Sequence, residues 1–466
     1  MSFVLYDLTF LSLFIILGAI FLYRRKKHLD RQGLLYLYRT KIGLKIIENT
    51  STKYKKILKP LQYLIILSGY FLMIFVVYAL IKFSYLYLTS PIVAQALKVP
   101  ILTPLFPYVD RLFGQGLLPP FYFTYWILTI AIVALSHEFA HGIIAKLNNI
   151  RVHSTGFGFL GPFIAFFVEP DEKQMKKAKI FPQLSILAAG TFANVLMTIL
   201  FGIIMLLFFT LAFVPAGVYF NSYSASLVNT SQITEVNGLL FTDLQQISSI
   251  NQSLIPITAD NQIYYTTPEM VLYTLSNNQS QLIAYDNSPA LNSNLSGAII
   301  DINGIKIKSY NDLNNTLSSH KPGDSIIVRT IDSNNNITEY PITLGEKSGR
   351  AFLGISIIPT QSSGMLSSIF GLISRVKNPG VYYISLMGDF GIFIYNLLWW
   401  TVFINLGVAL TNMIPVGIFD GGQFFYLSVL AVTRKKKVAD ILFRISTWFF
   451  ILLVTALMIK WVTIFF

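Results

Sequence analysis

The chain has 466 residues, of which 54% are hydrophobic and only 12% are charged, and its net charge is +13. A soluble globular protein carries about 25% charged residues, so this composition excludes an ordinary soluble domain and indicates a polytopic membrane protein. The sequence contains no cysteine, which excludes disulfides, thiol nucleophiles and thiolate metal sites.

Six apolar runs are long enough to cross a membrane as helices, which requires about 20 residues each. They lie at roughly 4–23, 61–88, 121–147, 181–213, 391–413 and 441–466. A further apolar stretch, 364–390, is broken by charged residues and Pro379 and is predicted to lie at the membrane interface. The predicted fold is therefore a polytopic α-helical membrane protein with about six transmembrane helices.

The distribution of positive charge sets the orientation of these helices. Segments 24–60, 146–180 and 423–444 carry 23 of the 35 Lys and Arg residues, and the positive-inside rule places them in the cytoplasm. Both termini then face outward in a multi-pass protein of the cell membrane. Topology and contact with anionic lipid in the bilayer account for the basic runs, so no nucleic acid is expected as a partner.

The segment between the fourth and fifth apolar runs is rich in Asn, Ser and Thr and is predicted to form an extracytoplasmic α+β domain. Residues 298–302 and 305–307 flank Asn303–Gly304, a pair typical of hairpin turns, and a short helix is predicted over 310–320. The order "SPA", "INGIKI", helix, "PGDSI" resembles a PDZ domain, and 224–247 echoes it. Such a domain would bind an extended peptide ligand; the alternative is a generic β-rich domain.

The third apolar run contains two histidines and a glutamate, in 137-HEFAH-141. Such groups inside a membrane are costly and usually have a function. His137 and His141 are four residues apart on a helix, so both can bind one metal ion, and Glu138 stands beside them as a general base. This is the H-E-x-x-H pattern of zinc hydrolases. The alternative, two buried histidines satisfied by carbonyl groups, leaves Glu138 unexplained.

Catalytic zinc usually has three protein ligands, so a third ligand is expected from another apolar run. Asp420, in 412-NMIPVGIFDGGQ-423, is the main candidate because it is an acid in an apolar context. The Pro and Gly residues around it break the helix and permit an irregular backbone that lines a cavity. His153 is a competing ligand, and a helix-terminating Asp–Gly turn is the structural alternative for Asp420.

Three motifs together resemble the site-2 protease family of intramembrane zinc metalloproteases. They are 137-HEFAH-141, 190-GTFAN-194 and the N-x-x-P-x-x-x-F-D-G pattern that starts at Asn412. The similarity covers about 121–213 and 288–425. Phe419 replaces the family's usual leucine and Thr191 its usual proline, and neither departure touches a chemical group. The first and last apolar runs are expected to be accessories.

The resemblance implies one catalytic Zn²⁺ held by His137, His141 and Asp420, with Glu138 as the general base. It also implies that Asn194 stabilises the developing oxyanion or holds the substrate backbone. From the sequence alone, Asn194 is a buried amide on a helix face of small residues, where it could join helices together.

The segment 154-STGFGFLGPFIAFFVEP-170 is apolar but is broken by Gly and Pro, and it is predicted to form a β-hairpin that dips into the membrane beside His141. The family has a re-entrant β-loop at this place. An exposed strand edge there could pair with an unwound substrate strand, because an intact transmembrane helix shields its peptide groups. The candidate substrate-binding residues are Gly156, Phe157, Gly158, Phe159, Asn412 and Pro415.

These predictions divide the chain into six parts. They are 1–60, the first helix and a basic segment; 61–120, the second helix and an outer loop; 121–213, the first part of the catalytic core; 214–363, the PDZ-like domain; 364–433, the interfacial segment and the second part of the core; and 434–466, the last helix. The active site is expected to open toward the cytoplasm, because His137 lies about 24 Å into its run.

The predicted function is an intramembrane zinc metalloprotease. It would hydrolyse peptide bonds in or near the transmembrane segments of single-pass membrane proteins, in regulated intramembrane proteolysis or in the clearance of membrane remnants. One alternative is a non-catalytic membrane chaperone or receptor that uses the PDZ-like domain. A zinc peptidase of another membrane type and a solute transporter are further alternatives.

Overall fold

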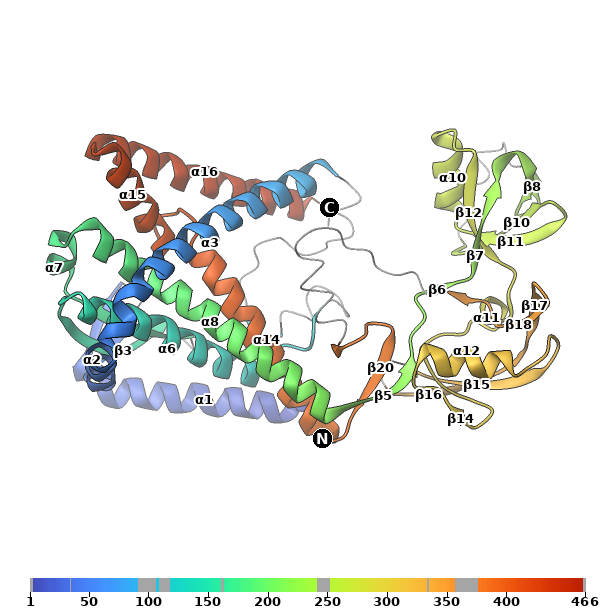
Figure 1. Ribbon diagram of the computed structural model, residues 1–466, viewed down its shortest axis with the longest axis horizontal. Coiled ribbons are helices and arrows are strands. Elements are labelled where there is room, and N and C mark those ends of the chain that lie inside the picture. Colours follow the sequence, from blue (N-terminus) through green and yellow to red (C-terminus); the bar gives the residue numbers. More distant parts are fainter. Residues whose placement is uncertain are drawn as a thin grey trace. The chain divides into compact units, whose positions relative to one another are not determined.

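The computed structural model describes residues 3–33, 35–90, 106–108, 118–160, 163–240, 252–332, 335–356 and 376–463. The chain divides into two compact units. One unit, Met1–Met205 with Phe393–Phe466, is mainly helical and is called the helical unit. The other, Leu206–Ile392, is called the strand-rich unit (Figure 1).

Within the described residues, six helices are long and apolar enough to cross a membrane, which confirms the predicted runs by length and composition. They are α1 (Phe3–Arg25), α3 (Lys55–Thr89), α6 (Phe123–Leu147), α8 (Ile180–Ala212), α14 (Gly388–Asn412) and α16 (Lys436–Val462). Shorter helices are α2 (Leu44–Lys53), α7 (Glu172–Lys177) and α15 (Asp420–Thr433). Helix α3 begins before its apolar run does, because a helix can continue through charged residues once it leaves the membrane.

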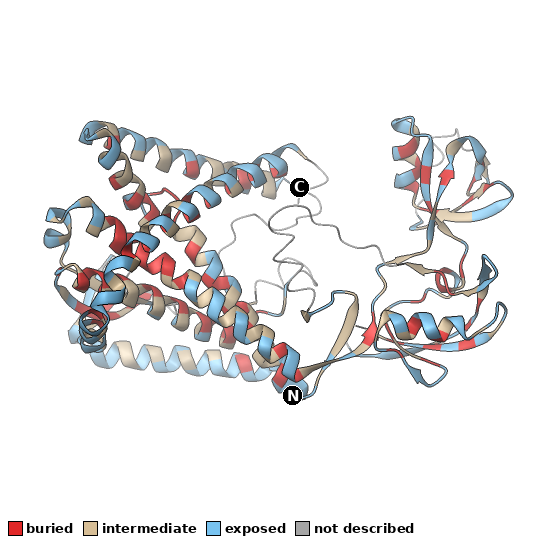
Figure 2. Ribbon diagram, viewed as in Figure 1, coloured by how far each residue is buried: buried red, intermediate tan, exposed pale blue. Residues whose placement is uncertain are grey.

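The core of the helical unit lies where α3, α6, α8 and α15 meet. Ala188 and Ala189 of α8 are at most 1% exposed, and such small residues let helix backbones approach closely. The buried residues in Figure 2 gather on these helices, whereas α1 and α16 are largely exposed. The exposed side chains of those two helices are mostly apolar, as contact with lipid requires.

Helix α1 caps the helix that carries HEFAH. Asp7 is 1% exposed and accepts hydrogen bonds from the backbone N–H groups of Phe123 at 2.8 Å and Thr124 at 2.9 Å. The hydroxyl of Tyr108 also donates to Asp7. The first N–H groups of a helix have no partner within the helix, and negative charge is favourable there. The first span is therefore part of the framework of α6 as well as a membrane anchor.

A four-stranded antiparallel sheet with the order β1-β2-β3-β4 packs against α6. Its strands are β1 (Leu29–Gln32), β2 (Leu35–Thr40), β3 (Val152–Leu160) and β4 (Phe163–Pro170). The hairpin predicted over 154–170 is confirmed as β3 and β4, although its depth in a membrane stays a prediction. The sequence does not predict β1 and β2, which lie in the segment interpreted only as basic and cytoplasmic.

The strand-rich unit contains two antiparallel sheets, ordered β7-β12-β11-β10-β8-β9 and β16-β15-β13-β5-β20, with β14 paired to β13. The strands of the first sheet are β7 (Ala225–Asn229), β8 (Ile233–Val236), β9 (Leu239–Leu240), β10 (Ile255–Ala259), β11 (Gln262–Thr266) and β12 (Gln281–Asp286). Those of the second are β5 (Phe213–Val218), β13 (Ala298–Ile302), β14 (Ile305–Lys306), β15 (Ser325–Ile331), β16 (Ile337–Thr343) and β20 (Val381–Ser385). Short strand pairs join β6 (Ser222–Tyr223) to β19 (Ile355–Ser356) and β17 (Gly345–Lys347) to β18 (Arg350–Phe352), and the helices are α10 (Pro268–Ser276), α11 (Pro289–Asn292) and α12 (Tyr310–Ser318).

Both sheets contain a hairpin closed by Asn–Gly. Asn303 and Gly304 have φ angles of 51° and 85°, and Asn237 and Gly238 have 52° and 77°, the left-handed values that a tight hairpin turn needs. In the first sheet, the hairpin strand β8 also pairs with β10, and β10 pairs with β11. In the second sheet, the hairpin strand β13 likewise pairs with β15, and β15 pairs with β16. The predicted hairpin and the helix near 310–320 are confirmed, and the sequence echo falls on a sheet of similar order.

Two predicted features fall partly outside the described residues. Residues 241–247 of the echo and 364–375 of the interfacial segment lie there, and β20 and the start of α14 occupy most of the remaining interfacial segment. The PDZ-like assignment stays a prediction.

An ion pair between the partly buried Asp286 and the half-exposed Lys347 joins β12 to the β17–β18 hairpin. The carboxylate of Asp286 accepts hydrogen bonds from the Ser224 and Ser226 hydroxyls at 2.6 Å and from Lys347 Nζ at 2.7 Å. Burial alone would raise the pKa of Asp286, but these hydrogen bonds, that of Lys347 first, outweigh it and hold the pKa below its usual range.

Candidate metal centre

The two histidines of HEFAH lie on the buried face of α6. His137 is 7% and His141 9% exposed, and their Nε2 atoms are 3.0 Å apart. A spacing of four residues places both side chains on one face of the helix, one above the other. The predicted pair therefore points to a single place in the core.

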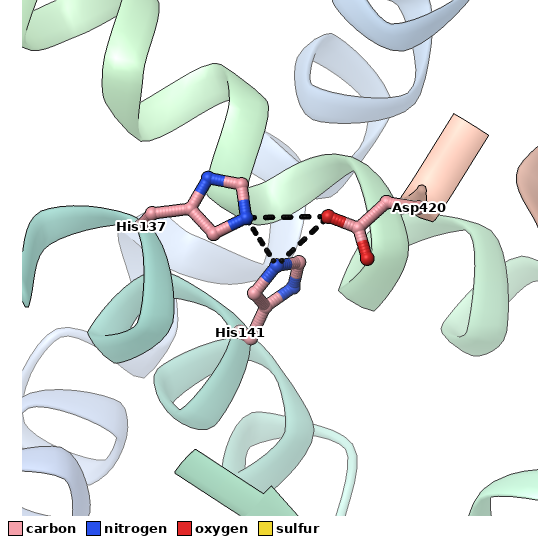
Figure 3. Close-up of side chains that lie close together, drawn as sticks. All are labelled: His137, His141 and Asp420. Atoms are coloured by element: carbon pink, nitrogen blue, oxygen red, sulfur yellow. Dashed lines mark hydrogen bonds and ion pairs between the residues drawn. The ribbon is translucent and has the colours of Figure 1, made fainter. Parts of the chain in front are cut away.

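Asp420 reaches that place from the other end of the chain. It is the first residue of α15, and its Oδ2 atom lies 3.2 Å from the Nε2 atom of each histidine (Figure 3). The ligand atoms of the three residues all lie within 4.8 Å of one another. The irregular turn at 413–419 ends α14 and starts α15, and it is what aims Asp420 back at α6.

Gly421 and Gly422 permit this turn. A Cβ on either glycine would run into the backbone of the turn, at Met413 and Val416 respectively. Only glycine lets the start of α15 pack this closely against residues 413–416. The D-G-G sequence is thus a packing requirement as well as part of a motif.

The distances between the three ligand atoms fit a bound metal ion. Ligand atoms held 2.0–2.1 Å from a tetrahedral ion such as zinc lie about 3.3 Å apart, close to the 3.0 and 3.2 Å separations of the present atoms. Gly190 of α8 leaves the space, because a Cβ there would lie 2.6 Å from His137 Nε2 and closer still to His141 Nε2. Two imidazoles and a carboxylate are also the ligand types that zinc accepts.

A backbone carbonyl orients His141. The Nδ1–H group of His141 donates to the carbonyl oxygen of Ile186 on α8, with 2.6 Å between the heavy atoms. A proton on Nδ1 leaves Nε2 free of one, and a free Nε2 is the atom that can bind a metal. Ile186 therefore selects the tautomer of His141 that suits a metal site.

Glu138 contacts the sheet. Its Oε2 atom accepts a hydrogen bond from the backbone N–H of Val168 on β4, at 3.0 Å. Both residues line a cavity of about 360 Å³ that also contains the metal-binding group. The lining residues are His137, Glu138, His141, Val168, Pro170, Met175, Ile186, Leu187, Asn412, Ile418, Phe419 and Asp420. The general-base candidate and the metal-binding group thus share one polar cavity.

The open edge of the sheet reaches this cavity at Val168. Val168 stands opposite Thr155 on β3, but its backbone N–H points to Glu138. Val168 and Thr155 are therefore a pair of the ladder that exchanges no backbone hydrogen bonds. The alternation of an antiparallel ladder then directs the backbone groups of Phe166 and Ile164 outward as well. Among the described strands, β4 pairs only with β3.

Charged side chains hold β4 in place next to the cavity. Glu169 accepts a hydrogen bond from the Ser154 hydroxyl at 2.6 Å and one from Arg39 Nε at 3.0 Å, which links β4 to β3 and β2. The hydrogen bond from Ser154, and then those from Arg39, keep the pKa of Glu169 below its usual range despite partial burial. The charged form of Glu169 therefore fixes the strand one residue away from Val168.

The remaining predicted residues lie in three different settings. Gly156, Phe157, Gly158 and Phe159 belong to β3, whose two edges are both paired, by β2 and by β4. Their backbone is therefore closed to a further strand, and the edge that could accept one belongs to β4. The competing ligand His153 is 3.1 Å from Asp171 and is not part of the group formed with Asp420.

The predicted site residues Asn412, Asn194 and Pro415 lie in three different environments. Asn412 lines the cavity, with its Nδ2 atom 3.5 Å from His137 Nε2. Asn194 contacts the opposite nitrogen of the same ring, with 3.0 Å between its Nδ2 and His137 Nδ1. Pro415 lies in the turn before Asp420, where its carbonyl accepts a hydrogen bond from Ser446 at 2.7 Å.

Several residues of this site are missed by sequence reasoning. The carbonyl of Ile186 and the N–H of Val168 are backbone groups, so the side-chain types carry no signal for them. Gly190 does have a sequence signal, because it lies four residues before Asn194 in GTFAN and therefore on the same helix face.

A helical membrane protein with a buried His-His-Asp group beside a glutamate has the architecture of a membrane metallopeptidase. The family model described as Peptidase family M50 matches residues 125–453, so the chain belongs to this family, the site-2 protease family. No curated protein matches the chain significantly.

Proposed function

We propose that the protein is an intramembrane zinc metalloprotease that cleaves peptide bonds in or near the transmembrane segments of single-pass membrane proteins. The observation that carries the proposal is the convergence of Asp420, at the start of α15, on His137 and His141 beside Glu138. The two histidines and Glu138 lie on α6, which is apolar enough to span a membrane. Membership of a metallopeptidase family supports catalysis over the alternative of a chaperone or receptor.

The proposed cofactor is one Zn²⁺ held by His137, His141 and Asp420. When bound, zinc would polarise the scissile carbonyl and lower the pKa of water. Glu138, in the same cavity, would accept the proton of the attacking water and deliver it to the leaving amine. The amide of Asn412 lines the cavity beside His137 and could donate a hydrogen bond to the substrate carbonyl as negative charge develops.

The proposed substrate site is the open edge of β4. An unwound substrate segment would pair with the outward backbone groups of Ile164, Phe166 and Val168, as in other cases of strand addition. The N–H of Val168 is held by Glu138, so an incoming strand would compete for it. Pairing at Val168 would therefore place a substrate peptide next to the metal-binding group and free the carboxylate of Glu138 for proton transfer.

The proposal also covers the orientation of the protein in the membrane and the role of the strand-rich unit. The basic segments place the metal-binding cavity toward the cytoplasm and the strand-rich unit outside. That unit would be a PDZ-like region with a possible peptide ligand, and its two sheets of similar order support a repeated module. The substrates would be single-pass proteins that reach the cavity from the lipid bilayer.

Glu138→Gln tests the catalytic proposal. The variant should lose cleavage of a membrane-helix substrate but keep zinc, because glutamine cannot take up the proton and Glu138 is not a ligand. Zinc content and cleavage would be measured on the purified full-length protein in detergent. Normal cleavage by this variant would refute the role of Glu138 as the general base. A native protein that binds zinc but cleaves no membrane-helix substrate would favour the chaperone or receptor alternative.

Ile164→Pro tests the strand-pairing proposal. Proline removes an N–H that points away from β3, and proline is tolerated at such edge positions. Cleavage should fall while zinc content stays constant. Ile164→Ala is the matched control, because it shortens the side chain but keeps the N–H. Equal cleavage by the proline and alanine variants would contradict pairing at this edge.

A further inference from the structure

Asn194 lies behind a metal ligand rather than in the cavity. It is 0% exposed, and its side-chain amide lies 3.0 Å from His137 Nδ1, the ring nitrogen that does not approach Asp420. Its other polar atom, Oδ1, is buried and has no hydrogen-bond partner among the residues that the structure describes. A buried amide oxygen without a partner costs free energy, so this arrangement calls for a physical reason.

We infer that Asn194 is a positioning residue that fixes the orientation and tautomer of His137 and does not contact substrate. The inference rests on the proposed function, because it supposes that His137 binds a metal through Nε2. It differs from the oxyanion role that the sequence resemblance implies.

One face of α8 presents three features to the two histidines. Ile186, Gly190 and Asn194 are spaced by four residues and so lie in one row along the helix. The Ile186 carbonyl accepts the Nδ1–H of His141, and the Asn194 side chain contacts Nδ1 of His137. Gly190, between them, lets the helix backbone come close to both Nε2 atoms. The row therefore gives each histidine its own partner on the side away from the metal site.

The tautomer of His137 decides which atom of Asn194 must face it. A metal-binding Nε2 carries no proton, so a neutral His137 carries its proton on Nδ1 and needs an acceptor there. Rotating the Asn194 amide by half a turn exchanges Nδ2 and Oδ1. This rotation lets Oδ1 accept the Nδ1–H of His137, and Nδ2 then occupies the buried position that Oδ1 leaves. Asn194 then serves His137 as the Ile186 carbonyl serves His141.

The position of Asn194 does not suit a donor to the substrate. An oxyanion donor must lie about 2.7–3.1 Å from the developing negative charge, inside the cavity that holds the substrate. Asn194 is not among the residues that line the cavity, whereas Asn412 is. The ring of His137 also separates Asn194 from the Nε2 side, where the reaction would occur.

Zinc affinity measured on four forms of the full-length protein tests the inference. The forms are the native protein, Asn194→Ala, Asn194→Asp and Thr191→Val, each titrated against a chelator in detergent. Asn194→Ala should bind zinc about 10–100-fold more weakly, the usual effect of removing the partner of a ligating histidine. Asn194→Asp should restore most of the affinity and keep cleavage, because a carboxylate accepts the Nδ1–H. Thr191→Val removes another buried polar group of α8, whose hydroxyl donates to the carbonyl of Ala188 on the same helix, and it should leave zinc affinity unchanged.

The outcomes separate this inference from the proposed function. Native zinc affinity in Asn194→Ala would overturn the positioning role alone. Full zinc binding but no cleavage in Asn194→Asp would also overturn it, because a carboxylate cannot donate to an oxyanion. If Asn194→Ala does not fold, Asn194→Asp decides the question by itself. Failure of the native protein to bind zinc would overturn the proposed function and this inference with it.

Discussion

Replacing Gly190 by alanine should remove the metal while leaving the helical unit folded. The added Cβ would lie 2.6 Å from both Cε1 and Nε2 of His137, and closer still to Nε2 of His141. Carbon and nitrogen atoms that are not bonded need about 3.5 Å, so the ring of His137 must move by about 1 Å. Two of these three atoms, Nε2 of His137 and Nε2 of His141, are the proposed ligand atoms themselves.

The size of this displacement decides the expected effect. Metal–ligand distances tolerate only about 0.2 Å of error, so a shift of about 1 Å takes the histidines out of the range of a metal ion. A displacement of that size near reacting groups can cost about 100-fold in rate. Overpacking in a core usually costs about 1–3 kcal/mol, which the rest of the helical unit can absorb. Loss of metal should therefore exceed loss of fold.

The measurement is zinc content, cleavage and thermal unfolding of Gly190→Ala in detergent. Gly202→Ala is the matched control, because Gly202 lies on the same helix and a Cβ there meets nothing within 4 Å. We expect Gly190→Ala to lose zinc and cleavage, and Gly202→Ala to keep both. Full zinc content in Gly190→Ala would refute the packing of α8 against the ligand pair.

Three further predictions concern other parts of the chain. Asp7→Ala removes the cap of α6 and should lower the free energy of unfolding by about 0.5–2 kcal/mol, measured by denaturant titration. The folded fraction should retain zinc. An unchanged denaturation midpoint would contradict the capping role of Asp7. The lowered pKa of Asp286 stabilises the strand-rich unit above about pH 4, and this stability is lost as pH falls through the folded pKa. Asp286→Asn should therefore flatten the acid side of its pH–stability curve, and an unchanged curve would count against the Lys347 pair. Because the native chain has no cysteine, Ser296→Cys should react with an impermeant maleimide from outside intact cells and Lys435→Cys should not; the reverse pattern would invert the proposed orientation.

The helices and the metal-binding group are largely predictable from the sequence, because each depends on local signals. Long apolar runs predict spans, and two histidines four residues apart predict one shared ligand position on α6. Asp420 is predictable because few carboxylates occur in apolar surroundings. The hairpin at Asn303–Gly304 follows from the φ angles that this residue pair tolerates.

The sheet beside the site shows where local signals end. Strand β2 lies in a segment dominated by lysine and arginine, and it becomes a strand by pairing with β3, more than a hundred residues later. That pairing closes the edge of Gly156–Phe159 and leaves β4 as the edge that faces Glu138. No residue type in either segment encodes this choice of partner.

The role of Asn194 is ambiguous for a different reason. An amide can donate or accept, so its presence in GTFAN fits an oxyanion donor and a partner of His137 equally well. Only the position of Nδ1, on the far side of the ring from Asp420, distinguishes the two. Asp7 is a similar case, because an acid near a terminus gives no sign of which helix it caps.

The central claim is that His137, His141 and Asp420 together hold one zinc ion. The most direct test is zinc X-ray absorption on the purified full-length protein and on Asp420→Ala, with zinc content measured on the same samples. We predict one zinc per chain in the native protein, with two imidazole nitrogens at about 2.0–2.1 Å and a carboxylate oxygen at about 2.0–2.2 Å. Asp420→Ala should lose the ion or the carboxylate contribution. An unchanged spectrum and zinc content in Asp420→Ala would contradict the claim.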